Sequence, residues 1–473
     1  MDIIFKGIKT PRNCYIYDRG RNAILAVSDS EYEELERLQR GLIKEEDSEV
    51  LKKYQNEGFL CPNTVTRIEH PCSGVLGHYL KNHVEKLTLQ VTQRCNLRCE
   101  YCIYSGNYDN RQHSDLDMSF ETAKKAIDLY LRSSGEMGEY SLGFYGGEPL
   151  LNLKLIKQCV EYAKSKTLGR KIGFAMTTNA TLLNDEVVDY LQREHFKIMI
   201  SLDGSKKDHD RHRKFQNGKG SFDVIQKNLK RIRERYPQFF ANITYNSVIN
   251  PDNDYQSIKS YFERDELLNS AEILTTIVES ENPGEKVKLS EDFLKIDKYD
   301  QLKLYLFMLG KLDKKDVSKL VLIRANYIIR KYNEIIKKAE IGSTCHHNGP
   351  CIPGTRRLFV SAQGDLFPCE RISETSPIMK LGDVQDGFDV EKVRKLLNVG
   401  QVTADLCKKC WALLHCNQCI RNADGKNHLS RKLKMRYCPD TRQEAYFSLK
   451  EICVLRELGC IFERSYKKKK KNY

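Results

Sequence analysis

From residue 86 onward, short segments with a two-residue apolar period alternate with longer segments whose apolar residues recur every three or four positions. The first pattern predicts β-strands and the second predicts amphipathic helices. Their alternation favours a mostly parallel sheet joined by right-handed helical crossovers, so an α/β fold is expected. Ligands bind such sheets at the carboxyl ends of the strands, and the alternation therefore also indicates where a site should lie.

The spacing predicts six strands in this region, at residues 87–92, 141–145, 171–177, 198–202, 242–249 and 272–278. Four helices are predicted between them, at residues 120–132, 153–165, 185–193 and 222–235. Two charged helices, at residues 302–309 and 317–336, are expected to bridge to a last region that is rich in cysteine and short of periodic structure. Because periodicity fails there, bound ligands are expected to organise that region.

The first 75 residues have a pattern of their own. Three short β-type runs precede two helical stretches, at residues 3–6, 14–18, 23–27, 29–38 and 46–57. Ser28 is a suitable N-cap for the first helix, and Gly41 and Gly58 are suited to end the two helices. Such a unit is too small to hold an active site but large enough to dock a partner.

The length and the charge of the chain limit the classes of function. At 473 residues, about three domains are expected. The net charge of +14 is spread along the chain and suits an acidic partner, while the basic run at residues 467–471 favours a solvated tail. No segment interleaves basic and aromatic residues as nucleic-acid-binding modules do, so no nucleic-acid partner is expected.

The cysteine content points to metal sites. The amino terminus lacks the pattern of a signal peptide, and no stretch of 18 apolar residues occurs, so a cytoplasmic protein with no membrane partner is expected. The cytoplasm keeps thiols reduced, so the seventeen cysteines are not expected to form a disulfide framework.

Three cysteines follow the first predicted strand of the sheet in the pattern Cys95-x3-Cys99-x2-Cys102. A loop this short can bring three sulfurs to one metal centre at the carboxyl end of the strand. Three thiolates leave one iron of a four-iron cluster without a protein ligand, and an open iron can bind a substrate. A zinc site, or a thioredoxin-like pair formed by Cys99 and Cys102, remains an alternative.

The spacing of these cysteines resembles the signature of the radical S-adenosylmethionine (AdoMet) superfamily. The resemblance implies a partial (β/α)6 TIM-like barrel, a four-iron cluster on the three cysteines and bound S-adenosyl-L-methionine. Residues at the positions where that family contacts AdoMet are Tyr101, Gly146, Gly147, Glu148, Pro149, Thr178, Asn179, Ser201 and Asp203. Taken singly, the Gly-Gly-Glu-Pro segment could be a tight turn and the tyrosine a packing residue.

Eight further cysteines lie between residues 345 and 438, which is the number that two fully ligated four-iron clusters require. With Gly364 shortly before Cys369, this stretch resembles the SPASM domain, an extension that carries auxiliary clusters. The resemblance implies that one auxiliary cluster is held by Cys345, Cys351, Cys369 and Cys419, and the other by Cys407, Cys410, Cys416 and Cys438.

Three alternatives remain open for this region. The chain has two residues between Cys416 and Cys419 where relatives usually have three, which leaves the final ligand open. In a second alternative Cys345 is a bystander, and the nearer cluster keeps an open iron for a substrate thiol. A pair of zinc ribbons would use eight cysteines as well. His346 and His347 are expected beside a ligand or at the surface rather than on the metal.

The amino-terminal unit resembles the leader-peptide recognition element of ribosomal peptide maturases. The resemblance implies a winged-helix-like α+β module that binds the leader of a precursor peptide as an added strand. With this unit, the whole chain resembles sactipeptide and ranthipeptide maturases, which form cysteine thioether crosslinks. A reductant such as flavodoxin or ferredoxin is then an expected partner, and Glu370 is expected to accept a proton. The unit could instead be a cap without a ligand, and Glu370 a surface ion-pair partner.

The same core serves other reactions. A sulfatase-type maturase, which oxidises a protein cysteine or serine to formylglycine, is the strongest rival, and carbon–carbon crosslinking of side chains is another. A zinc-stabilised protein-binding module is the alternative outside the enzymes. The predicted divisions are a leader-binding module at 1–75, a radical AdoMet core at 86–284, a helical bridge at 285–340, a SPASM domain at 341–460 and a basic tail at 461–473.

Overall fold

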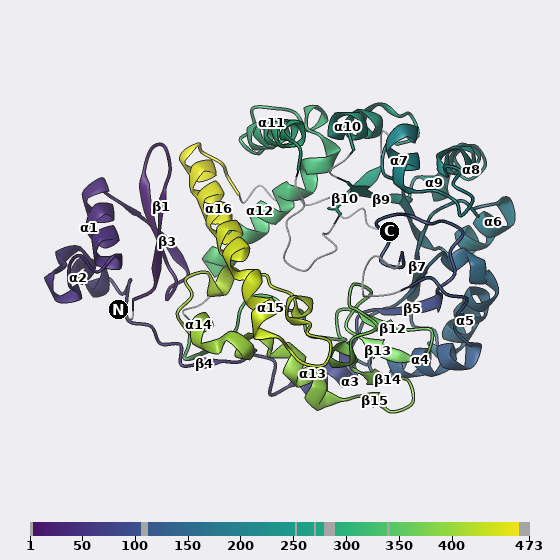
Figure 1. The fold of residues 1–473 in the computed structure, drawn as a ribbon, viewed down its shortest axis with the longest axis horizontal. Helices are drawn as coiled ribbons and strands as arrows, with labels where there is room; N and C mark the ends of the chain where they lie inside the picture. Colours follow the sequence, from purple (N-terminus) through teal and green to yellow (C-terminus); the bar gives the residue numbers. More distant parts are fainter. Residues whose placement is uncertain are drawn as a thin grey trace.

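The computed structural model describes residues 3–105, 112–250, 253–268, 271–278, 289–337 and 341–462. Most of the predicted basic tail, residues 463–473, lies outside the described residues. The amino-terminal unit lies at one end of the molecule and the large sheet at the other, with helices α12 (Lys319–Lys337) and α16 (Cys438–Glu457) between them (Figure 1). None of the described helices combines the length and the hydropathy of a membrane span.

Six parallel strands form the centre of the large sheet. In spatial order they are β5 (Leu87–Thr92), β6 (Tyr140–Gly146), β7 (Ile172–Thr178), β8 (Lys197–Ser201), β9 (Thr244–Ile249) and β10 (Glu272–Ile277). These are the six predicted strands, with ends that differ from the prediction by no more than two residues. The predicted α/β fold with a partial TIM-like sheet is confirmed.

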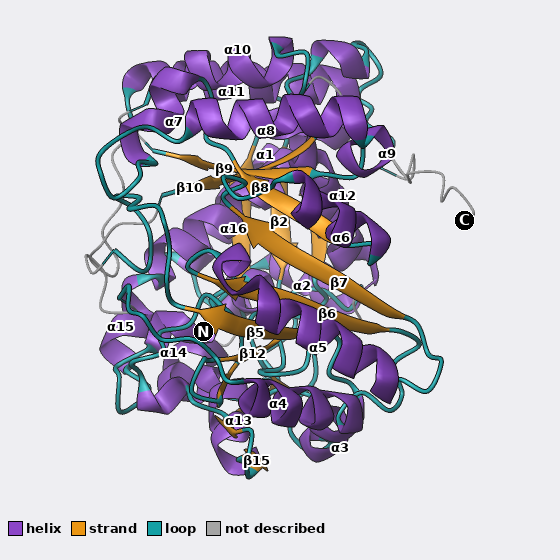
Figure 2. Cartoon of the chain, turned by 90° about the vertical axis from the view of Figure 1, so that its right-hand side faces the viewer, coloured by secondary structure: helices purple, strands orange, loops and turns teal. Residues whose placement is uncertain are grey.

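Helices cover the outer face of this sheet (Figure 2). They include α4 (Phe120–Arg132), α5 (Leu153–Lys166), α6 (Asp185–Arg193), α8 (Phe222–Arg235) and α10 (Tyr255–Arg264). Leu87, Leu89 and Val91 of β5 belong to the hydrophobic core that these helices share. Because side chains alternate along a strand, Thr88, Gln90 and Thr92 point to the inner face, where they too are buried.

The sheet continues beyond the barrel into the carboxyl-terminal region. Strand β12 (Leu358–Val360) pairs parallel with β5, and β13 (Asp365–Phe367), β14 (Gly382–Asp383) and β15 (Gly387–Phe388) follow in antiparallel order. The result is one sheet of ten strands. The cysteine-rich region is therefore joined by backbone hydrogen bonds to the strand that precedes Cys95, a pairing that the sequence pattern did not predict.

The carboxyl-terminal region also contains more helix than was predicted. Its helices are α13 (Val390–Leu397), α14 (Ala404–Lys408), α15 (Arg431–Arg436) and the 20-residue α16. The first bridging helix, α11 (Glu291–Met308), begins eleven residues earlier than predicted, because Ser290 caps it by accepting a hydrogen bond from the backbone N–H of Phe293. Little periodic structure was expected between residues 345 and 438; α13, with 8 residues, is the longest helix described within that stretch, and α16 begins at its last residue.

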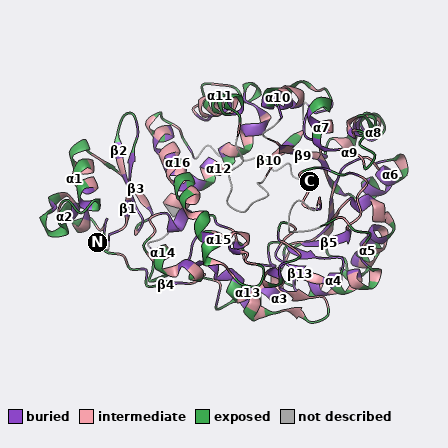
Figure 3. Cartoon of the chain, in the orientation of Figure 1, coloured by how far each residue is buried: buried purple, intermediate pink, exposed green. Residues whose placement is uncertain are grey.

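The amino-terminal unit is an antiparallel sheet of β1 (Phe5–Lys9), β2 (Cys14–Asp18) and β3 (Ala23–Val27), followed by α1 (Asp29–Gln39) and α2 (Glu49–Asn56). Ser28 caps α1 as predicted, in a reciprocal capping box with Glu31. Alternate side chains of the sheet pack in two directions: one set packs with α1 and α2, and the other packs with α16. Figure 3 colours residues of this sheet by how far they are buried.

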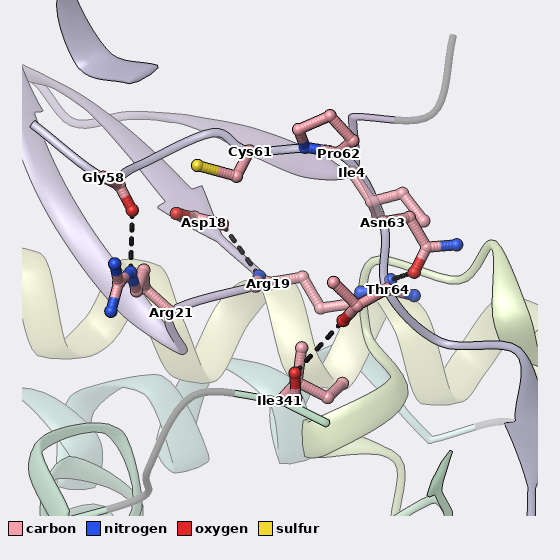
Figure 4. A pocket seen from close by; sticks show the side chains of 11 residues that line it. Ile4, Asp18, Arg19, Arg21, Gly58, Cys61, Pro62, Asn63, Thr64 and Ile341 are labelled. Atoms are coloured by element: carbon pink, nitrogen blue, oxygen red, sulfur yellow. Dashed lines mark hydrogen bonds between the residues drawn. The ribbon is translucent and has the colours of Figure 1, made fainter. Parts of the chain in front are cut away.

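A buried arginine fastens this unit to the carboxyl-terminal region. Arg19 donates from Nη1 to the backbone oxygen of Lys408 at 2.6 Å and contacts Asn63 through Nη2. A pocket at this junction is lined by Ile4, by residues 18–21 at the end of β2, by residues of the segment 58–64 and by Ile341 (Figure 4). Two-residue strands β4 (Arg67–Ile68) and β11 (Thr344–Cys345) add a parallel pairing close by. The unit is thus integrated into the molecule.

Candidate cluster and cofactor site

The structure brings Cys95, Cys99 and Cys102 together directly after β5. Burial raises the pKa of Cys95 to about 12, and the charges of Glu148, Cys99 and Cys102 raise it as well. Burial also raises the pKa of Cys99 to about 12, against the lowering effect of Arg213. Neutral thiols are therefore favoured until a cation draws them together as thiolates, which is the behaviour of a metal-binding loop.

Polar contacts that the sequence reasoning missed hold this loop in place. Asn96 donates to the Oγ1 of Thr181 at 2.8 Å, and Asn179 donates to the Oδ1 of Asn96 at 2.9 Å. The Nδ2 of Asn179 lies 4.0 Å from the Sγ of Cys95. Asn179 was predicted as a cofactor contact, and here its side chain fixes the cysteine loop against the end of β7.

The two predicted glycines after β6 are required by close packing of the backbone. A Cβ on Gly146, whose φ is +144°, would lie 2.0 Å from the backbone oxygen of Thr92, and one on Gly147 would lie 2.2 Å from that of Arg94. The N–H of Gly147 donates to the Thr92 oxygen at 3.0 Å. The glycines thus let the end of β6 approach the chain that leads into Cys95.

Glu148 connects three strand ends. Its carboxylate accepts hydrogen bonds from the backbone N–H of Leu150 at 3.1 Å, from the Oγ1 of Thr178 at 2.8 Å and from the backbone N–H of Asn179 at 2.7 Å. Burial raises its pKa to about 7, although these three donors lower it. Because two oxygens offer about four acceptor positions, one position remains for a ligand ammonium.

Asp203 is held by a residue that the sequence reasoning missed. Arg213, also buried, donates to its two oxygens at 2.7 and 3.2 Å, and the hydroxyl of Tyr101 and the N–H of Val248 donate to it as well. Burial raises the pKa of the Asp203 carboxyl, but the Arg213 guanidinium outweighs burial and holds that pKa below its usual value. This predicted AdoMet contact is thus an ion-paired carboxylate in this structure.

The remaining predicted cofactor residues lie at the same edge of the sheet. Pro149 opens a short 3-10 turn that Glu148 caps, and Ser201 is the last residue of β8. The ring of Tyr101 lies 5.3 Å from the Arg213 guanidinium. The nine predicted contacts therefore occupy the cysteine loop and the carboxyl ends of β6, β7 and β8, the edge at which such sheets bind ligands.

The later cysteines fall into groups that affect one another electrostatically. Burial raises the pKa of Cys369 to about 11, and the charges of Glu370, Cys419 and Cys351 add to that shift. Burial likewise raises the pKa of Cys410, with contributions from Cys407 and Cys438. Burial raises the pKa of Cys416 to about 11, and the charges of Cys410 and Cys407 raise it as well. These charge effects link Cys351, Cys369 and Cys419 in one group and Cys407, Cys410, Cys416 and Cys438 in another, and the assignment of each group to a cluster stays a prediction.

Cys345 packs in a hydrophobic cluster that also contains Cys407. Burial lowers the pKa of Arg19, and the negative charges of Cys345 and Cys410 raise it. This placement favours the alternative in which Cys345 is not a ligand of the nearer cluster. Its assignment to that cluster stays a prediction.

The charged and polar side chains near Cys416 suit an anionic metal cluster. Lys434 is 1% exposed and makes no ion pair with any described carboxylate, yet its ammonium opposes the rise that burial causes in the pKa of Cys416. His347 is also buried, and neither ring nitrogen has a hydrogen-bond partner among the described residues. A buried cation and buried donors are costly unless an acceptor is bound, and thiolates on a cluster are such acceptors.

Two carboxylates follow Cys369. The expected proton acceptor, Glu370, forms an ion pair with Arg357 at 2.5 Å. Glu374, which the sequence reasoning missed, accepts a hydrogen bond at 2.7 Å from Nε2 of Gln90 on the inner face of β5. The same Nε2 donates to the hydroxyl of Tyr104, two residues beyond Cys102. Glu374 therefore contacts the inner side of the barrel close to the cysteine loop.

Comparison with known protein families identifies the core. Residues 89–264, which include the cysteine loop and the strand ends β5 to β9, match the radical SAM superfamily. These residues form a radical SAM domain. The match spans the three predicted cluster cysteines and all nine predicted cofactor residues.

Relatives of the radical SAM domain extend this finding. The chain is 26% identical over 363 residues to the cysteine-type anaerobic sulfatase-maturating enzyme of Clostridium perfringens strain 13, covering 74% of this chain and 92% of that protein. It is 40% identical over 138 residues to the uncharacterized protein MJ0907 of Methanocaldococcus jannaschii, and the match spans 45% of that protein. The solved structure of native anSMEcpe with bound AdoMet shares the fold, with a TM-score of 0.56, 21% identity and coverage of 78% and 99% of the two chains.

Proposed function

We propose that the chain is a radical SAM enzyme that oxidises a residue of a peptide or protein substrate. The observation that carries the proposal is the cysteine loop after β5, backed by the polar strand ends and joined through β12 to the later cysteines. When bound, AdoMet and a four-iron cluster supply a 5′-deoxyadenosyl radical that removes a hydrogen atom, and clusters at the later cysteines supply an electron acceptor.

For the product, we favour a cysteine thioether crosslink. A hydrogen atom leaves the α or β carbon of an acceptor residue, and a peptide thiol loses its proton as its sulfur bonds to that carbon. The crosslink thus removes two hydrogens and leaves one electron for the acceptor. The chain's contribution is to orient the substrate and to accept the thiol proton.

Two residues are suited to accept that proton. Glu370 follows Cys369 and is the position that the family resemblance indicates, but its carboxylate is paired with Arg357. Glu374 faces Gln90 and lies nearer the inner face of β5. Proton transfer requires hydrogen-bond reach to the substrate, so we rank Glu374 beside Glu370. Replacing each by glutamine would separate their roles.

The amino-terminal sheet supports a peptide rather than a folded protein as the substrate. Both faces of this sheet are covered, but β3 lies at its edge and makes no backbone hydrogen bond with another described segment beyond its pairing with β2. An extended peptide can pair with such an edge. The net charge of +14 suits an acidic leader.

Formylglycine formation is the second candidate. It is favoured by the similarity to a protein named as a sulfatase-maturating enzyme over 74% of this chain. The same radical SAM domain and cysteine groups serve either reaction, because both remove two electrons from the substrate. Carbon–carbon crosslinking is a third outcome of the same oxidation.

Co-expression followed by mass spectrometry tests these alternatives. The full chain is expressed with short cysteine-rich peptides encoded beside its gene and, separately, with a sulfatase-derived peptide. A loss of two hydrogens per crosslink, with the cysteine blocked to alkylation, is expected for the precursor peptide. A hydrazine-reactive aldehyde would favour formylglycine. Cys95→Ala should abolish either product, and Cys61→Ala, which removes an exposed thiol, should not.

A further inference from the structure

Two histidines and a glutamate converge on the surface at the amino-terminal end of the barrel. His78 lies in α3 (Leu76–Asn82), His83 follows that helix, and Glu136 lies in the loop between α4 and β6. The Nε2 of His78 is 3.3 Å from one carboxylate oxygen of Glu136, and the Nε2 of His83 is 2.9 Å from the other. One ligand atom from each residue lies within 4.8 Å of the other two.

The backbone under this cluster is fixed by hydrogen bonds. The N–H of Glu136 donates to the oxygen of Asn82 at 3.2 Å, and the N–H of Val84 donates to the oxygen of Ser133 at 2.9 Å. The buried hydroxyl of Ser134 donates to the oxygen of Val84 at 2.6 Å. The two segments that carry the three side chains are therefore held in register before any ligand binds.

We propose that His78, His83 and Glu136 form a zinc site. Zinc takes imidazole nitrogen and carboxylate oxygen at about 2.0–2.2 Å in a tetrahedron, which separates its ligand atoms by roughly 3.3 Å. The separation between His78 and Glu136 already has this value. The three residues are partly exposed, so water takes the fourth position.

Asn82 contacts one of the two histidines. Its side-chain nitrogen lies 3.2 Å from the Nδ1 of His78 and donates to the backbone oxygen of the same residue at 3.3 Å. Because Nδ1 carries the proton when a histidine binds zinc through Nε2, zinc binding requires the Asn82 side chain to turn away from Nδ1. The site lies at the opposite end of β5 from the cysteine loop, because His83 precedes that strand and Cys95 follows it. Bound zinc would thus clamp the connector from the amino-terminal unit to the barrel.

Zinc uptake by the full chain tests the proposal. The protein carries its reconstituted iron–sulfur clusters under anaerobic conditions, so that the cluster thiolates are occupied. Equilibrium dialysis against zinc compares the wild type with His83→Ala and Glu136→Gln. The matched control is Glu139→Gln, which removes a carboxylate of the same loop that pairs with Lys171. Hydrogen exchange of residues 76–84 and 133–138 is followed with and without zinc.

The wild type and Glu139→Gln are expected to bind one more zinc per chain than the other two variants, whose affinity at this site should fall at least about tenfold. Zinc should slow exchange in both segments of the wild type and in neither segment of His83→Ala. Equal zinc uptake by the wild type and His83→Ala would overturn the proposal. Equal loss in Glu139→Gln and His83→Ala would overturn it too, since it would indicate general attraction to surface charge.

Discussion

Glu148 and Asp203 are both buried carboxylates at the same edge of the sheet, yet their surroundings act in opposite directions. Burial raises the pKa of Glu148 to about 7, because its partners are neutral donors. Burial also raises the pKa of Asp203, but the Arg213 guanidinium outweighs burial and holds that pKa below its usual value. The Glu148 carboxyl therefore changes its protonation near neutral pH, whereas the Asp203 carboxylate stays ionised there.

Replacing Glu148 by glutamine should change how stability depends on pH. A carboxyl whose pKa is higher in the folded state favours folding when protonated, and this contribution is lost as pH rises from about 4.5 to about 7. Relative to Glu148→Gln, the wild type should lose on the order of 3 kcal/mol between pH 4 and pH 8. Denaturant unfolding of both proteins at the two pH values measures this, and parallel pH profiles would contradict it.

Asp203→Asn should destabilise the protein strongly, since it leaves the buried Arg213 guanidinium without a counter-charge. The expected loss is about 3–5 kcal/mol, measured by denaturant unfolding. Asp223→Asn is the control, because Asp223 pairs with Lys206 at the surface and should matter by less than about 1 kcal/mol. Similar losses for the two variants would be inconsistent with this account.

At the scale of elements, local sequence patterns were sufficient to predict the strands and helices of the barrel. Strands such as β5 and helices such as α4 appear where the apolar period changes, because that period reflects which side faces the core. The pairing of β12 with β5 joins residues far apart in the chain, and no local pattern encodes it. The partner of Asp203 was missed for a different reason: Arg213 lies near it in the chain, but a lone arginine carries no spacing signal.

The edge of β3 provides a test of peptide docking. Ala26 is exposed on that strand, and Ala26→Glu would place a negative charge beside an incoming acidic leader. The variant should bind the precursor peptide at least about tenfold more weakly than the wild type, as measured by fluorescence anisotropy. Asn56→Glu on α2 adds the same charge at another exposed position and should have little effect. Equal weakening by both variants would indicate general repulsion instead of docking at this edge.

At the scale of the whole molecule, the metal content distinguishes clusters from zinc ribbons. Three four-iron clusters predict about twelve irons and as many labile sulfides per chain. A double variant, Cys351→Ala with Cys419→Ala, should lose about four of each. Cys61→Ala should lose none. Zinc without labile sulfide in the anaerobically purified protein would sink the cluster interpretation.

The pairing of β12 with β5 also affects how the chain is made. Strand β5 is finished early in synthesis, but its outer edge has no partner until residues 358–360 have emerged. At typical rates of protein synthesis this takes roughly 15 to 50 s, during which an unpaired edge invites wrong pairing. A chain cut before β12 would keep that edge permanently. Shortened barrels are therefore expected to aggregate in the cell, and β12, which is translated late, protects the strand that precedes Cys95.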